Sequence, residues 1–253
     1  MPFMIIDTET TSLNKPFCYD LGIIIYDDNF NPIKRAHYVV EQNWHNLPLF
    51  ETAYYKEKRP KYVALMRSHK AIMKKYGYIM RDIVRDIQEY NIEAVYAYNA
   101  PFDDNTIAFN CEWFKCNNPF EAIPVYDIRG YANQFITNTQ DYKAFCDKNN
   151  FYTDTGNYSA TAENVYRYIT NNIDFDEAHT GLEDAEIEGQ ILKYCVDHGA
   201  ALNTEYEVTK ILSRPVTKPY TIKVNGKVIH TGEYTKLYQR DNKWYFTEPT
   251  NEE

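Results

Sequence analysis

The first part of the chain alternates short apolar runs with turn-forming residues. Apolar runs at residues 4–6, 21–26 and 33–40 are separated by segments rich in Asp, Asn, Ser, Thr and Pro. This pattern is typical of strands joined by turns. Two later apolar runs, at residues 94–98 and 123–126, complete a set of five predicted strands.

Helical periodicity appears between and after these strands. Ile79, Ile83 and Ile87 recur at every fourth position, which predicts one apolar helix stripe. Further helical segments are predicted around Ile107 and Phe114, Tyr131 and Phe135, Tyr142, Phe145 and Cys146, and Ala162, Val165, Tyr166 and Ile169. A last helix begins near Leu182. Strands that give way to helices predict an α/β domain over residues 1–199.

The pattern changes after residue 199. Residues 200–218 resemble a linker with a short helix, and residues 219–253 contain four short β-rich runs. An Asn225-Gly226 pair, which favours a type I′ turn, joins the first two of these runs. We therefore expect a small C-terminal β appendage.

Composition narrows the class of protein. The chain has 253 residues, of which 44% are hydrophobic, enough for one sizeable core with an appendage. No apolar run approaches the ~18 residues that span a bilayer, so we expect a cytoplasmic protein without a membrane partner. Five cysteines, odd in number and without CxxC spacing, predict reduced buried thiols.

The net charge of −9 argues against a protein that coats nucleic acid with a broad basic surface. The charge does not exclude a nuclease, because an active site built from acids adds negative charge that bound cations offset. One segment departs from the average, since residues 44–76 are irregular in pattern and basic in their second half.

Acidic residues follow several of the predicted elements. Asp7 and Glu9 come directly after the first strand at spacing i, i+2, so their side chains point to the same side. Two carboxylates this close favour a bound cation, although they could simply end the strand before a turn. Asp103 follows the fourth strand, and Asp184 lies in the first turn of the last helix, five residues after His179. Each acid would be fixed by the element beside it.

These residues fall into three recognisable motifs. Asp7-x-Glu9, Asn99-x3-Asp103 and His179-x4-Asp184 resemble the motifs of the DnaQ-like 3′-5′ exonucleases of the DEDD superfamily. Histidine five residues before the last Asp is similar to the histidine subtype, DEDDh. The resemblance covers roughly residues 1–198 and implies a ribonuclease H-like mixed five-stranded sheet flanked by helices.

The resemblance also implies an activity. A DEDDh enzyme would hydrolyse phosphodiester bonds from a free 3′ end and release nucleoside 5′-monophosphates, and single-stranded DNA is the first expected substrate. The alternatives are RNA trimming and a catalytically silent binding or interaction protein on the same fold. For the enzyme, a nucleic acid with a free 3′ end is the expected partner.

Site roles follow from the same resemblance. Asp7, Glu9, Asp103 and Asp184 would hold two divalent cations, with Asp7 touching both, and His179 would act as the general base. Carboxylate oxygens are hard ligands that suit Mg²⁺ or Mn²⁺. The residues implied to contact the substrate are Thr8, Thr10, Leu13 and Asn99. For Thr10 and Leu13 the alternatives are a turn and the core.

Two positions depart from the family pattern. Ser12 stands where the family has glycine and Tyr98 where it has histidine, so the loop over the 3′ end could differ in shape. Other acids are given structural roles: Asp127 as a helix N-cap, Asp104 as a helix cap, and Glu183, Glu186 and Glu188 as a solvated helix face. The appendage could grip a strand, dock a polymerase or another protein, or pair with a second copy, and the favoured interpretation is a plain solvated hairpin.

Overall fold

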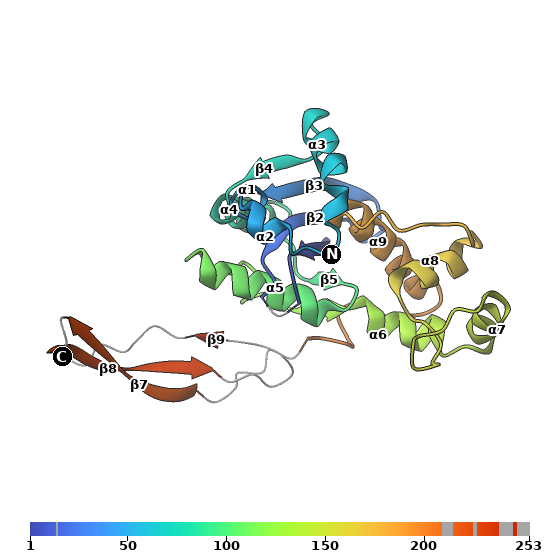
Figure 1. Ribbon diagram of the computed structural model, residues 1–253. Coiled ribbons are helices and arrows are strands. Elements are labelled where there is room, and N and C mark those ends of the chain that lie inside the picture. The colour runs from blue at the N-terminus through green and yellow to red at the C-terminus, as the bar shows by residue number, and fades with distance from the viewer. Residues whose placement is uncertain (14, 209–214, 225–226, 238–244, 247–253) are drawn as a thin grey trace. The chain divides into compact units, whose positions relative to one another are not determined.

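A computed structural model describes residues 1–13, 15–208, 215–224, 227–237 and 245–246 (Figure 1). The chain divides into two compact units, Met1–Val208 and Thr209–Glu253. The predicted linker thus begins inside the first unit, where Val208 N–H donates to the Val125 carbonyl.

A six-stranded mixed sheet forms the centre of the first unit, in the order β4-β3-β2-β1-β5-β6. The five predicted strands are all present. They are β1 (Phe3–Thr10), β2 (Cys18–Tyr26), β3 (Pro32–Val40), β5 (Val95–Ala97) and β6 (Val125–Asp127). The sheet has one more strand than predicted, β4 (Ile72–Lys74), which pairs in parallel with β3. Three residues within a basic segment are too short a run to show strand periodicity.

Helices cover both faces of this sheet (Figure 1). The α-helices are α1 (Glu41–His45), α2 (Leu47–Phe50), α3 (Arg59–Arg67), α4 (Tyr76–Glu89), α5 (Ala100–Trp113), α6 (Ile128–Ala132), α7 (Gln140–Asn149), α8 (Ala162–Thr170) and α9 (Gly181–Asp197). A 3-10 turn, η1 (Lys56–Lys58), precedes α3, and a π-helical turn, η2 (Asn133–Thr137), follows α6. None of the described helices is long and apolar enough to span a membrane.

Strand β1 sends alternate side chains into two apolar clusters. Met4 and Ile6 pack with residues of α4 and α5, whereas Phe3 and Ile5 pack in the cluster that includes the apolar residues of α9. Because successive strand side chains alternate between faces, Asp7 continues the Phe3 and Ile5 series. The first acid of the chain is therefore directed to the side of the sheet that α9 covers.

The second unit contains a three-stranded sheet, as a β appendage predicts. Strand β7 (Pro215–Val224) pairs antiparallel with β8 (Lys227–Leu237), which pairs with β9 (Tyr245–Phe246). Val224 is opposite Lys227 in the register, as expected for a two-residue connection. The predicted Asn225-Gly226 turn itself lies outside the described residues.

Candidate active site

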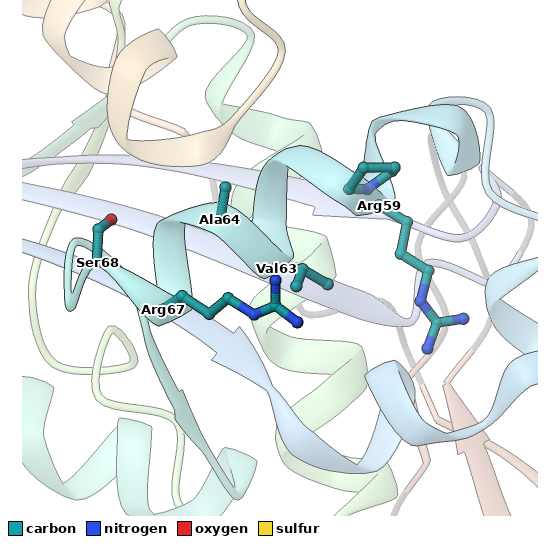
Figure 2. A pocket seen from close by; sticks show the side chains of 6 residues that line it. Arg59, Val63, Ala64, Arg67 and Ser68 are labelled. Atoms are coloured by element: carbon teal, nitrogen blue, oxygen red, sulfur yellow. The ribbon is translucent and has the colours of Figure 1, made fainter.

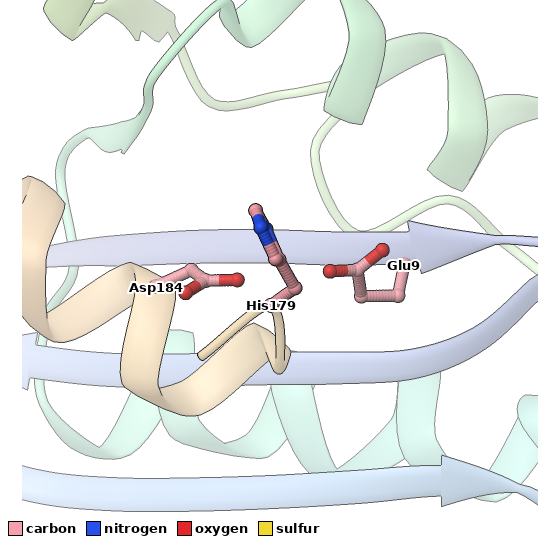
Figure 3. A group of neighbouring side chains, drawn as sticks. All are labelled: Glu9, His179 and Asp184. Carbon is pink, nitrogen blue, oxygen red and sulfur yellow. The ribbon is translucent and has the colours of Figure 1, made fainter. Parts of the chain in front are cut away.

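The end of β1 and the start of α9 bring three predicted site residues together. Glu9, His179 and Asp184 each offer a ligand atom, and these atoms lie within 4.8 Å of one another (Figure 3). Glu9 lies on β1, His179 lies in the loop before α9, and Asp184 lies in the first turn of α9. The structure thus brings together three of the five residues that the sequence analysis names as catalytic.

Two glycines allow α9 to approach the sheet this closely. A Cβ atom on Gly22 of β2 would lie 1.9 Å from the carbonyl carbon of Gly181, and a Cβ on Gly181 would lie 2.5 Å from the Gly22 nitrogen. Real Cβ atoms do not approach backbone so closely. The pair therefore fixes the distance between the sheet and the first turn of α9, which carries Asp184.

Asp20 ties the same helix start to the sheet. It is completely buried on β2, and its carboxylate accepts hydrogen bonds from Gly181 N–H at 2.8 Å and from the Tyr62 hydroxyl at 2.7 Å. His37 Nε2 lies 2.7 Å from the other oxygen. Because Asp20 is opposite Glu9 in the β1–β2 register, one buried carboxylate links both sides of the site.

Two of the acids have buried oxygens without a hydrogen-bond partner among the described residues, namely Asp7 Oδ2 and Asp184 Oδ1. Burial, and then repulsion by neighbouring carboxylates, raises the pKa of Asp7 well above its usual value and that of Asp184 to about 9. Burial also raises the pKa of Glu9 to about 8. In the absence of a cation, the cluster therefore favours protonated carboxyls at neutral pH.

Asp103 is held differently. Its Oδ1 accepts hydrogen bonds from the Thr8 N–H at 3.0 Å and the Thr8 hydroxyl at 2.7 Å, and the side chain is 2% exposed. Burial raises its pKa to about 7, opposed by these hydrogen bonds. Asp7 and Asp103 lie outside the 4.8 Å group, although the charge of Asp103 is one of those that raise the pKa of Asp7.

His179 has an unusual backbone and a stacked ring. Its φ is +48°, in the left-handed region, and the imidazole stacks on the Tyr55 ring with centroids 4.2 Å apart. Nδ1 lies 3.6 Å from Glu177 Oε2. Burial and the nearby Lys58 ammonium lower the pKa of His179 below its ordinary value. The ring is therefore mainly neutral at pH 7, the form that can accept a proton.

The four residues implied to contact substrate lie in different environments. Leu13 is 82% exposed, so the core alternative for this residue is wrong. The Thr10 hydroxyl donates to the Ser12 carbonyl at 3.4 Å, in agreement with the turn alternative. Thr8 is buried against Asp103. Asn99 is the left-handed residue before α5, with its N–H donating to Asp127 Oδ1 at 2.9 Å.

Structural roles given to other acids can also be compared with the fold. Asp127 accepts from Arg129 N–H and caps α6, which confirms the predicted N-cap. Glu183 and Glu186 lie on the surface, paired with Lys61 and Arg35. The prediction of a solvated position for Glu188 is wrong, because the side chain is 3% exposed.

Glu188 belongs to the acidic cluster. Its Oε2 has no hydrogen-bond partner in the described part of the chain, and its charge is the first among the carboxylates that raise the pKa of Asp7. Burial, followed by the charge of Asp103, raises its own pKa well above the ordinary value. The sequence signal was present, because residues four apart share a helix face, and Glu188 follows Asp184 by four.

Three further residues near the site, Asp20, Glu177 and Tyr55, have weaker sequence signals. Asp20 begins an apolar run, where a buried acid is unexpected. Glu177 is mostly buried, and burial raises its pKa to about 7. Tyr55 is one of 24 tyrosines and nothing in its local sequence distinguishes it.

The donor set fits a hard divalent cation. All the acids of the cluster offer oxygen, the ligand atom that Mg²⁺ and Mn²⁺ prefer. The buried oxygens of Asp7 and Asp184 that have no partner in the described part of the chain also indicate a cation site. Buried carboxylates without a partner are destabilising unless a cation satisfies them.

Comparisons with known proteins concern the fold that carries this site. No protein-family model and no curated protein matches the sequence. Among solved structures, the nuclease domain of 3′hExo, a DEDDh family member, bound to rAMP, matches with a TM-score of 0.55 at 9% identity, over 82% of this chain and 97% of that one. The chain has the fold of the DEDDh exonucleases.

Two further solved structures share this fold. A 3′-exonuclease that recognises the 3′ end of a histone mRNA stem-loop matches with a TM-score of 0.53 at 8% identity, over 83% of this chain and 91% of that one. A zinc-bound complex of E. coli exonuclease I with single-stranded DNA matches with a TM-score of 0.50 at 15% identity, over 78% of this chain. The present chain spans 41% of that exonuclease.

Proposed function

We propose that this protein is a metal-dependent 3′-5′ exonuclease that releases nucleoside 5′-monophosphates from a free 3′ end. The observation that carries the proposal is the meeting of Glu9, His179 and Asp184 within 4.8 Å at the end of β1, on the strand that also carries Asp7, whose buried Oδ2 has no hydrogen-bond partner among the described residues. The DEDDh fold supports the same reaction class.

Four acids would hold the cations in this proposal: Asp7, Glu9, Asp103 and Asp184. When bound, two divalent cations would supply Lewis-acid activation of water and stabilisation of the leaving oxygen. Mg²⁺ or Mn²⁺ suits the oxygen ligands. Asp103 also has a positioning task, since its hydrogen bonds to Thr8 hold α5 against the strand that carries Asp7 and Glu9.

His179 is proposed as the general base. Its lowered pKa keeps the imidazole neutral near pH 7, so the ring nitrogen can accept a proton from the attacking water. The Tyr55 ring stacked against it limits the orientations that the imidazole can adopt. Glu177, 3.6 Å from Nδ1, would stabilise the imidazolium that forms.

Single-stranded DNA is the proposed substrate, with RNA as the alternative. Leu13, four residues after Glu9 in the chain, is exposed, so its apolar side chain is free to pack against a terminal base of either nucleic acid. A catalytically silent protein is disfavoured physically, because partnerless buried carboxylates reduce stability without a benefit when no cation binds.

Digestion of end-labelled single strands tests the proposal. We expect wild-type protein to digest DNA in Mg²⁺, and the Asp7→Asn and Asp184→Asn variants to be inactive while remaining folded by circular dichroism. Glu186→Gln, on the exposed face of α9, is the matched control and should retain activity. Full activity of either site variant would overturn the proposed site.

A further inference from the structure

A cluster of basic residues begins beside the candidate active site. Between residues 56 and 75 the chain has eight Lys or Arg and one acidic residue, Glu57, whereas the whole chain has a net charge of −9. The segment comprises η1, α3 and β4. Such a concentration of positive charge in an acidic protein requires a physical reason, because neighbouring cations repel one another.

This segment is connected directly to the site. Lys58 Nζ donates to the Ala178 carbonyl at 2.8 Å, next to His179. Tyr55, just before η1, carries the ring that stacks on His179. At the start of α3, Lys61 pairs with Glu183 in the first turn of α9. The basic segment therefore starts at the site and continues outward along α3.

A groove lies along α3 beyond these contacts. It has a volume of about 740 Å³ and is lined by Arg59, Pro60, Val63, Ala64, Arg67 and Ser68. Figure 2 shows Arg59 at one end of the helix and the Arg67 side chain extending along it beside Val63. The groove thus combines two guanidinium groups with a small apolar floor, a combination that suits phosphates and the faces of bases.

The two arginines that line this groove are available to bind an anionic ligand. Lys56, Lys61 and Lys74 pair with carboxylates, but in the described part of the chain neither Arg59 nor Arg67 forms an ion pair. Arg59 is held by ring contacts, with its guanidinium carbon 4.8 Å from the Trp44 centroid. Arg67 is exposed in the last turn of α3. Both can therefore accept an anionic ligand without breaking an existing pair.

We propose that the groove along α3 binds the phosphate backbone of the single strand whose 3′ end occupies the active site. This inference rests on the proposed function. The eight residue steps between Arg59 and Arg67 span about 12 Å at ~1.5 Å per residue. That length corresponds to about three to four stacked nucleotides at ~3.4 Å each. Strands long enough to reach Arg67 should bind more tightly than shorter ones.

Binding of fluorescein-labelled oligothymidine to the full chain in EDTA, where the strand stays intact, tests the groove. Strands of about four and about sixteen nucleotides are compared over a range of KCl concentrations. We expect Arg67→Gln to weaken binding of the long strand about fivefold and to lower the slope of log K against log salt by about 0.7. Binding of the short strand should not change.

Lys148→Gln is the matched control, because Lys148 is also an exposed cation in the last turn of a helix, α7. Unchanged long-strand affinity and salt slope in Arg67→Gln would overturn the inference, as would an equal loss in Lys148→Gln. Digestion of the short strand in Mg²⁺ is scored separately. If wild type digests neither strand, the proposed function fails, while the binding series still decides whether the groove binds a strand.

Discussion

At the scale of single residues, burial gives the site its properties. Asp7, Asp184 and Glu188 each have a buried oxygen without a partner in the described residues, and each has a raised pKa. The pKa of His179 is shifted the other way, below its ordinary value, which favours the neutral imidazole. The same desolvation thus favours uncharged acids and an uncharged histidine until cations bind.

The pH dependence of metal-free stability follows from these shifts. A carboxyl whose pKa rises from 3.8 unfolded to about 9 folded binds more protons in the folded state. The contribution of the Asp184 carboxyl to the free energy of unfolding is therefore fully present below pH ~4 and is lost as pH rises toward about 9. In EDTA, Asp184→Asn should be more stable than wild type at pH 8 by about 1–3 kcal/mol, and nearly equal to it at pH 4.

Urea unfolding at the two pH values measures this difference. Added Mn²⁺ should stabilise wild type more than the variant, because a ligand that binds only the folded state stabilises it. A variant less stable than wild type at pH 8 in EDTA would show that Asp184 has a structural partner instead.

The role of His179 predicts a pH profile for hydrolysis. Because burial and Lys58 hold its pKa below the ordinary 6.5, the base form predominates at pH 7, and the rate should fall only at a pH below that ordinary value. His179→Ala should slow hydrolysis by about 10²–10⁴-fold and remove this acidic limb. Single-turnover rates between pH 5 and pH 8 provide the measurement, and an unchanged limb would exclude His179 as the base.

At the scale of elements, the close contact between β2 and α9 positions the site. Gly22 and Gly181 meet backbone to backbone, and Asp20 accepts from the Gly181 N–H. The positions of Asp184 and His179 relative to Glu9 depend on this contact, although neither glycine takes part in the chemistry.

Gly22→Ala should therefore reduce activity strongly and destabilise the fold by about 1–3 kcal/mol, the usual range for overpacking. The Cβ would lie 1.9 Å from the Gly181 carbonyl carbon, so α9 must move. Gly77→Ala on α4 is the control, because its Cβ would meet only the Cys116 Cβ at 3.7 Å and alanine favours a helix. The measurements are thermal unfolding and hydrolysis rates of both variants. Equal activities of the two variants would contradict the account.

Sequence patterns predicted the strands and helices better than they predicted the tertiary contacts of single side chains. The apolar runs located five strands of the sheet, and the motif spacing selected Glu9, His179 and Asp184, whose ligand atoms the fold brings within 4.8 Å of one another. The three-residue β4 was missed because it is too short for periodicity. Asp20 and Glu188 were missed as functional neighbours because burial of a polar side chain depends on tertiary packing, which local spacing does not show.

At the scale of the whole molecule, charge is distributed unevenly between an acidic site and a basic segment. The acids at the end of β1 and on α9 favour cations, and the cations of η1 and α3 favour phosphates. This separation would allow a chain of net charge −9 to act on a polyanion, as the proposed function requires. A cytoplasmic location and a partner for the second unit stay predictions from the sequence.

The central claim is hydrolysis from a free 3′ end by the acidic site. A 5′-labelled single strand of DNA or RNA, incubated with the full chain in Mg²⁺, reports direction, substrate and cation dependence in one time course. We predict a ladder that shortens from the 3′ end, nucleoside 5′-monophosphate as product, and no digestion in EDTA or when the 3′ end is blocked. Digestion of the blocked strand, or equal digestion in EDTA, would contradict the account.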